Sequence, residues 1–168
     1  MSDTIRKVIK EAIPFVIIII CVLLVKQFIV TPIQVNGDSM YPTLKDGDLM
    51  LLNRIGYKFG SINRFDIVVV DSGDSYIIKR VIGLPGETVK FQNNVLYIDN
   101  EEIEESFLEE GKYTNDFEYS VSDNCYFVMG DNRERSRDSR EFGCFDESKI
   151  KGKTSLTFFP FSRLGFKN

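Results

Sequence analysis

The chain has 168 residues, a formal net charge of -4, and 43% hydrophobic and 27% charged residues. This length and composition fit one folded domain of ordinary size and exclude a chain that is disordered throughout. The acidic balance argues against a nucleic-acid-binding protein, which would carry a basic surface. The sequence contains no histidine, which excludes a Ser-His-Asp triad, a Cys-His dyad and an imidazole-bound metal. Acid–base chemistry near neutral pH would need a lysine, carboxylate, cysteine, tyrosine or terminal amine with a shifted pKa.

The first feature along the chain is a long apolar segment. Residues 12–25 are apolar without a break, and Phe28 to Val30 extend the run past Lys26 and Gln27. As a helix, residues 12–30 would span about 28 Å, which is close to the hydrocarbon thickness of a bilayer. A buried core helix would show a polar stripe to water, but this segment is apolar on every face. A cleavable signal peptide would end in a small-x-small site, and none follows this segment. We therefore predict an uncleaved transmembrane anchor at residues 12–30.

The charges that flank this segment predict its orientation. Arg6, Lys7 and Lys10 precede the apolar run, and positive flanks favour the cytoplasmic side. Residues 1–11 are thus predicted to be a cytoplasmic N-terminus, and residues 31–168 an extracytoplasmic domain at the cell membrane. Of the three cysteines, only Cys125 and Cys144 would lie outside the membrane. An oxidising exterior permits a disulfide between them, but two cysteines in one domain do not require it.

The pattern after residue 31 predicts a domain that is mainly β. Alternating runs rich in β-branched and aromatic residues predict strands at 66–70, 76–82, 87–91, 95–98, 125–129 and 153–159. Leu84–Glu87 has the proline and glycine of a type II turn, and Asn93–Asn94 fits a tight hairpin turn. Residues 99–118 form an acidic insertion, which we interpret as a solvated loop or surface hairpin because its spacing matches no calcium loop.

Ser39 is the first candidate for chemistry. It lies in the polar turn Gly37–Leu44, shortly after the apolar segment. A serine in a turn of Gly, Asp and Pro is usually only a turn residue. Tyr41 also occupies the place of the second glycine of a G-x-S-x-G nucleophile elbow. The serine therefore needs a second group before it can be considered a nucleophile.

Lys79 is the candidate for that second group. Alternation along a strand places Ile77, Lys79 and Val81 on one face and Ile78, Arg80 and Ile82 on the other. If this sheet has a buried face, one of the two cations must face inward, and lysine costs less to bury because it can lose its proton. An edge strand with both cations in water is the alternative. Burial that lowers the lysine pKa by about 2.5 would make Lys79 a working base.

The third element is the loop Gly130–Gly143, which interleaves arginines with Asp and Glu. Arg133 and Arg135 stand where an EF-hand would need oxygen ligands, so an EF-hand is excluded. The mixture of charges favours an ion-pair network over a phosphate-binding loop.

The segments around Ser39, Asp66, Lys79 and Gly130 together resemble the type I signal peptidase (leader peptidase) family. They occur in that family's order, after an apolar segment, and the resemblance covers most of residues 12–160. It implies a coiled antiparallel β-sheet domain with the shape of a partial barrel. No cofactor or metal is implied.

The resemblance also implies roles for individual residues. Ser39 resembles the nucleophile and Lys79 its general base, while Ser136 resembles a hydroxyl that hydrogen-bonds the lysine amine. Asp138 and Arg140 resemble an ion pair that stiffens their loop, with Asp131 and Arg133 nearby. By the same resemblance, the shallow apolar substrate pockets would be lined by Val35, Met40, Leu44, Ile77 and Ile78. The Ser39 N–H would be one oxyanion donor, whereas Gly37 stands where part of the family has a serine, which leaves the second donor open.

These features predict a membrane-anchored serine endopeptidase that removes signal peptides from exported preproteins after small residues. Its partners would be signal peptides emerging from the secretion channel and the lipid bilayer. The resemblance also implies that Phe158, Phe159 and Phe161 hold the site at the bilayer, although core packing explains them equally well. The alternatives are an inactive membrane-anchored β-domain that binds exported proteins and a self-cleaving repressor-type Ser-Lys protease. The repressor would need a DNA-binding module, whereas this N-terminus is occupied by the apolar segment.

Overall fold

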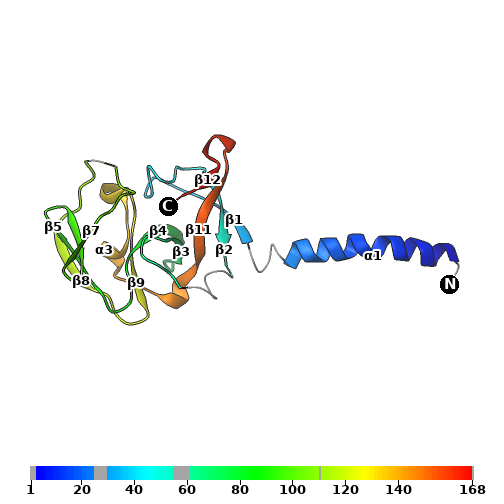
Figure 1. The fold of residues 1–168 in the computed structure, drawn as a ribbon, viewed down its shortest axis with the longest axis horizontal. Coiled ribbons are helices and arrows are strands. Elements are labelled where there is room, and N and C mark those ends of the chain that lie inside the picture. Colours follow the sequence, from blue (N-terminus) through cyan, green and yellow to red (C-terminus); the bar gives the residue numbers. More distant parts are fainter. Residues whose placement is uncertain (1–2, 25–29, 55–60, 110, 168) are drawn as a thin grey trace.

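The chain from Val30 onward forms two antiparallel β-sheets (Figure 1). The computed structural model describes residues 3–24, 30–54, 61–109 and 111–167. The strands are β1 (Val30–Gln34), β2 (Leu49–Asn53), β3 (Ile67–Asp71), β4 (Tyr76–Gly83), β5 (Thr88–Gln92), β6 (Val95–Ile98), β7 (Glu101–Ile103), β8 (Phe117–Ser120), β9 (Cys125–Met129), β10 (Phe145–Asp146), β11 (Ile150–Phe159) and β12 (Gly165–Phe166). The helices are α1 (Asp3–Leu24) and α3 (Ser139–Phe142), with the 3-10 turns η2 (Arg133–Arg135), η3 (Glu147–Lys149) and η4 (Phe161–Arg163).

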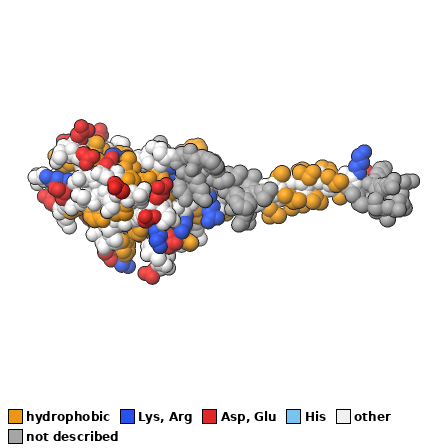
Figure 2. Space-filling view, turned by 90° about the horizontal axis from the view of Figure 1, so that it is seen from below, with side chains coloured by type: hydrophobic (Ala, Val, Ile, Leu, Met, Phe, Trp, Pro, Cys, Tyr) orange, Lys and Arg blue, Asp and Glu red, His pale blue; other side chains and the backbone are white. Residues whose placement is uncertain are grey.

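The N-terminal helix α1 extends away from the sheets (Figure 1). Its apolar side chains between Ile13 and Leu23 are exposed, and Figure 2 shows them along the helix. Among the described residues, no helix combines the length and apolarity that a bilayer crossing requires. The predicted anchor at 12–30 is therefore not shown: α1 ends at Leu24, residues 25–29 lie outside the described residues, and Val30 already belongs to β1.

The large sheet has the order β1-β2-β11-β3-β4-β9-β10, and β12 pairs with β11. The small sheet has the order β7-β6-β5-β8. The predicted mainly β fold of coiled antiparallel sheets is thus confirmed, and all six predicted strands are present with ends shifted by a few residues at most. The two short strands that flank the Ser39 turn, β1 and β2, were not predicted. In β2, Met50 and Leu52 alternate inward and are buried.

Both predicted turns are confirmed by the backbone. Gly86 has a φ of 81°, and the Glu87 N–H donates to the Leu84 carbonyl at 3.2 Å. Asn93 and Asn94 have φ values of 53° and 66°, as a two-residue hairpin between β5 and β6 requires.

The acidic insertion at 99–118 begins as a surface hairpin, which is one of the two structures predicted for it. It begins with a hairpin turn at Asp99 and Asn100, whose φ values are 50° and 70°, and continues into β7 at the edge of the small sheet. Farther along, Thr114 is only 1% exposed. Part of this segment therefore packs against the rest of the domain.

Candidate active site

The turn that carries Ser39 joins β1 to β2. Met40 and Leu44 are 1% and 0% exposed, and they pack in an apolar cluster with Val35 beneath the turn. Within the turn, the Tyr41 N–H donates to the Asp38 carbonyl at 3.0 Å and the Leu44 N–H to the Met40 carbonyl at 2.9 Å. Ser39 itself stays partly exposed. Buried neighbours thus fix the turn while the hydroxyl remains accessible.

Lys79 reaches this hydroxyl from the middle of β4. Lys79 is only 3% exposed, and in the sheet it lies opposite Val68 of β3. The Lys79 amine donates to Ser39 Oγ at 2.8 Å and to the Ile78 carbonyl oxygen at 2.9 Å. The structure therefore brings together two residues that are 40 positions apart in the sequence.

The surroundings of Lys79 favour its neutral form. Burial lowers the pKa of the amine from 10.5 to about 8, although the negative charges of Asp138 and Asp131 act in the opposite direction. A lysine with this pKa has an appreciable free-base fraction near neutral pH. A free amine in contact with a serine hydroxyl can accept the hydroxyl proton, which is the chemistry that activates a nucleophile.

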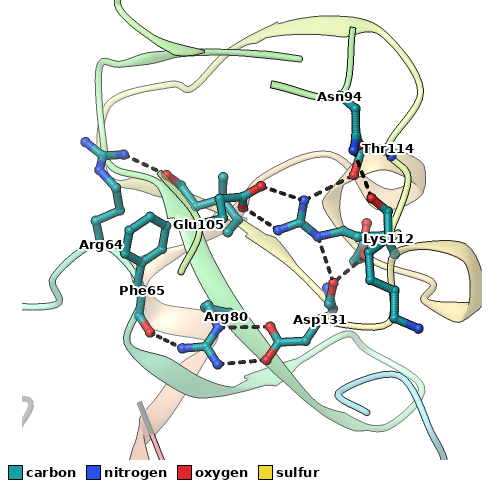
Figure 3. Close-up of polar contacts among 12 residues, drawn as sticks. Arg64, Phe65, Arg80, Asn94, Glu105, Lys112, Thr114 and Asp131 are labelled. Atoms are coloured by element: carbon teal, nitrogen blue, oxygen red, sulfur yellow. Dashed lines mark hydrogen bonds and ion pairs between the residues drawn. The ribbon is translucent and has the colours of Figure 1, made fainter. Parts of the chain in front are cut away.

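Arg80, the next residue on β4, is also fully buried. Its guanidinium donates to both carboxylate oxygens of Asp131, at 2.9 and 2.7 Å, and to the Phe65 carbonyl at 2.9 Å (Figure 3). It also lies 4.0 Å from the centre of the Phe107 ring. The predicted burial of Lys79 is confirmed, but Arg80 on the opposite face of β4 is buried as well, because Asp131 compensates the charge that Arg80 cannot lose.

The loop after β9 holds the Ser39 turn in place. The backbone N–H of Asn132 donates to the Ser39 carbonyl at 3.0 Å, and its side-chain amide donates to the Asp38 carbonyl at 3.0 Å. Thr43 Oγ1, at the other end of the turn, donates to Asp131 Oδ2 at 2.5 Å. Asp131 thus connects the serine turn to Arg80, the neighbour of Lys79 on β4.

Gly130 lies at the closest approach of this loop to the serine turn. A side chain at this position would overlap the Ser39 carbonyl oxygen and the Ser136 side chain. The Gly130 N–H donates to Asp138 Oδ2 at 3.0 Å. Only a residue without Cβ lets the two segments come this close.

Asp138 and Arg140 form the predicted ion pair. Arg140 donates to the two carboxylate oxygens of Asp138, at 2.8 Å each. Burial alone would raise the pKa of Asp138, but the Arg140 guanidinium and the Gly130 N–H hold it below its ordinary value. Arg140 also donates to the Arg133 carbonyl at 2.8 Å, so the pair closes the loop on itself.

Ser136 does not make the predicted contact with the lysine amine. Its hydroxyl oxygen is buried and has no hydrogen bond of good geometry to any residue that the structure describes. It lies beneath Gly130. The structure therefore places Ser136 next to the site without joining it to Lys79.

Four of the five predicted pocket residues gather in one place. Val35, Met40 and Leu44 belong to one buried cluster, against which Ile78 packs. Ile77 points away from it and packs on a second cluster that contains Val68 and Val70. This separation follows from the alternation of side chains along β4.

A groove of about 370 Å³ runs beside this cluster. Its lining includes Ile33, Gln34 and Asn36 from β1 and the residues after it, and Tyr76 and Ile78 of β4. The pairing between β4 and β9 begins only at Arg80, and β1 is an edge strand of the large sheet.

Cys125 and Cys144 form a disulfide with a Cα–Cα distance of 5.7 Å, which resolves the question that the sequence left open. The bond joins the first residue of β9 to the residue before β10. It therefore closes the base of the loop that carries Gly130, Ser136 and Asp138.

Sequence reasoning missed Thr43 and Asn132, which hold the serine turn, and Glu105, which pairs with Arg133. Asn132 follows Gly130 and Asp131 directly after a buried strand, and this is the one local signal that could have drawn attention to it. Thr43 and Glu105 carry no such signal, because their partners are distant in sequence.

Comparisons with known proteins show the family of this chain. The family model for signal peptidase, peptidase S26, matches residues 6–159. The chain is 39% identical over 171 residues to signal peptidase I S of Bacillus subtilis (strain 168), covering 95% of this chain and 93% of the relative. It is 40% identical over 185 residues to signal peptidase IB of Staphylococcus aureus (strain MRSA252), covering 98% and 94% of the two chains.

A solved structure is also similar to this chain. The crystal structure of a signal peptidase I from Enterococcus faecalis V583 is similar to this chain with a TM-score of 0.52 and 34% sequence identity. The similarity covers 56% of this chain and 97% of the crystallised one. Since both the family model and the relatives match over nearly the whole length, the chain belongs to the signal peptidase family, peptidase S26.

Proposed function

We propose that this peptidase removes N-terminal signal peptides from exported preproteins, with Ser39 as nucleophile and Lys79 as general base. The observation that carries the proposal is the 2.8 Å contact between Ser39 Oγ and the Lys79 amine, made where burial lowers the pKa of that amine to about 8. Family membership supports the substrate class.

In the proposed reaction, neutral Lys79 accepts the proton of Ser39 while Oγ attacks the carbonyl carbon of the scissile bond. The carbon–nitrogen bond then breaks, and the lysine ammonium gives its proton to the leaving amine, which leaves an acyl-enzyme. Lysine next accepts a proton from water, whose oxygen attacks the ester, and returns that proton to Ser39 as the acid departs. The Ser39 N–H would be one donor to the developing oxyanion.

The groove lined by residues of β1 and β4 suits an extended peptide. Residues 76–79 of β4 extend beyond the pairing with β9, and β1 lies at the sheet edge, so a peptide between them could bond to both backbones. The cluster of Val35, Met40, Leu44 and Ile78 would form the floor of the pockets for small side chains before the scissile bond.

We further propose that the apolar stretch from Ala12 onward attaches the enzyme to the cell membrane, with the N-terminus cytoplasmic and the β-domain outside. The exposed apolar side chains between Ile13 and Leu23 support this placement, as do the basic residues before them. Such an anchor would hold the groove where preproteins leave the secretion channel.

The test is cleavage of a purified preprotein by the full-length enzyme in detergent, with the new N-terminus identified by mass spectrometry. Ser39→Ala and Lys79→Arg should each lower the cleavage rate by about three orders of magnitude, because one removes the nucleophile and the other cannot lose its proton. The matched controls Ser122→Ala and Lys90→Arg should cleave normally. An active Ser39→Ala enzyme would refute the mechanism, and a wild-type enzyme that binds the preprotein without cleaving it would favour the inactive binding domain.

A further inference from the structure

The acidic insertion at 99–118 contacts the residues that support the dyad. Glu105 accepts hydrogen bonds from Arg133 through both carboxylate oxygens, and the two side chains are only 10% and 1% exposed (Figure 3). Arg133 also donates to Thr114 Oγ1 at 3.1 Å. Removal of either partner of such a buried ion pair would leave the other as an uncompensated charge away from water.

Arg133 transmits this contact to the serine turn. Its Nε donates to the Gly130 carbonyl at 3.1 Å, and Gly130 is packed against the backbone of Ser39 so tightly that a side chain would not fit. Asn132, the residue before Arg133, donates twice to the turn, at the Asp38 and Ser39 carbonyls. The orientation of Arg133 therefore affects both Gly130 and Asn132, the two residues that contact the backbone of the serine turn.

The same insertion makes two further contacts with the site. The Phe107 ring packs on the guanidinium of Arg80, 4.0 Å from its centre, and edge-on against Phe65 at 5.0 Å. Lys112 lies 6.0 Å from the centre of the Tyr41 ring, which belongs to the serine turn. The insertion thus contacts both the strand of Lys79 and the turn of Ser39.

We propose that Glu105 is a positioning residue for the Ser39–Lys79 dyad, acting through Arg133 and Gly130; this inference rests on the function proposed above. Without its carboxylate, the guanidinium of Arg133 would remain buried beside Thr114 and the Gly130 carbonyl with its charge uncompensated. An unpartnered buried charge is strongly destabilising, so the Arg133 side chain would shift from this position, and Gly130 and the serine turn would shift with it. Displacement of a nucleophile lowers kcat more than it changes substrate binding.

The test compares Glu105→Gln with Glu104→Gln in the full-length enzyme. Both variants remove one negative charge from the same segment, but Glu104 is exposed whereas Glu105 is paired with Arg133. With a preprotein as substrate and activity normalised to folded enzyme, Glu105→Gln should lower kcat about tenfold and leave KM unchanged. Glu104→Gln should match the wild type. Glu105→Asp, which keeps the charge but is one methylene shorter, should give an intermediate kcat and serves if the Gln variant does not fold.

The outcomes separate this inference from the function on which it rests. If kcat of folded Glu105→Gln, or of Glu105→Asp where only that variant folds, equals that of the wild type, Glu105 merely stabilises the fold and the inference is wrong. A change in KM alone would also refute it, because it would place Glu105 in substrate binding. An active Ser39→Ala enzyme, in contrast, would refute the proposed function itself, whatever Glu105→Gln does.

Discussion

Replacing Lys79 by methionine should stabilise the protein at pH 7 while abolishing its activity. The amine has an ordinary pKa of 10.5 and a pKa of about 8 in the folded protein, because burial disfavours the ammonium. This difference corresponds to about 3 kcal/mol of destabilisation wherever the amine is charged in both the folded and unfolded states. Methionine has a similar length and no charge to bury, but it loses the hydrogen bonds to Ser39 Oγ and the Ile78 carbonyl. The net gain at pH 7 should therefore be about 1 to 3 kcal/mol.

The dependence of this gain on pH follows from the direction of the pKa change. Between pH 8 and 10.5 the unfolded chain binds a proton at Lys79 that the folded protein has lost. The wild type therefore recovers stability as the pH rises through this window. Lys79→Met has no such group, so its advantage should be constant below about pH 8 and should disappear toward pH 10.5.

Urea unfolding of the full-length chain in detergent, followed at several pH values from 6 to 10.5, measures this difference. Lys90→Met is the matched control, because Lys90 is also a strand lysine but its side chain is only partly buried. Its stability should follow that of the wild type at every pH. If Lys79→Met is less stable than the wild type at pH 7, or if its advantage does not change with pH, the amine is not held toward its neutral form.

Three further predictions concern the same site. The value of kcat/KM for preprotein cleavage should rise with pH, reach half its maximum near pH 8, the pKa of Lys79, and level off about one pH unit higher; a profile that is flat from pH 6 to 9 would contradict the role of Lys79. Gly130→Ala should lower kcat about 100-fold in a folded enzyme, because the added Cβ displaces the Ser39 backbone. An unchanged cleavage rate would show that the close approach of Gly130 to Ser39 does not matter for catalysis. Reduction of the Cys125–Cys144 bond should lower the free energy of unfolding by about 3 kcal/mol, given the 19-residue separation. Urea midpoints with and without dithiothreitol would show this, and Cys21→Ser should respond as the wild type does.

Much of the β-fold could be predicted from local patterns. The strands around Val68, Lys79 and Phe127 are runs of β-branched and aromatic residues, and the turns at Gly86 and Asn94 contain the residues that their backbone angles require. Strand β1 was missed because Val30 continues an apolar run that was assigned to a single anchor.

The site was only partly predictable, because its supports depend on contacts between distant segments. The burial of Arg80 required a compensating carboxylate, and nothing near Arg80 in the sequence identifies Asp131, which lies 51 positions away. Likewise, the acidic composition of residues 99–118 suggested solvation, whereas the buried Arg133 binds Glu105 from this segment. Composition describes a segment on its own, but burial depends on what packs against it.

The two adjacent cations of β4 have a consequence for strand register. Lys79 and Arg80 point to opposite faces, and each has its own partner, Ser39 for the amine and Asp131 for the guanidinium. A register shift of one residue would place the permanently charged guanidinium of Arg80 beside the Ser39 hydroxyl. It would place the Lys79 amine, which cannot bind a carboxylate in the bidentate manner of a guanidinium, beside Asp131. The two side chains therefore favour a single register of β4. A chain with these two residues in reverse order would keep its composition and strand propensity, yet neither side chain would find the partner that suits it.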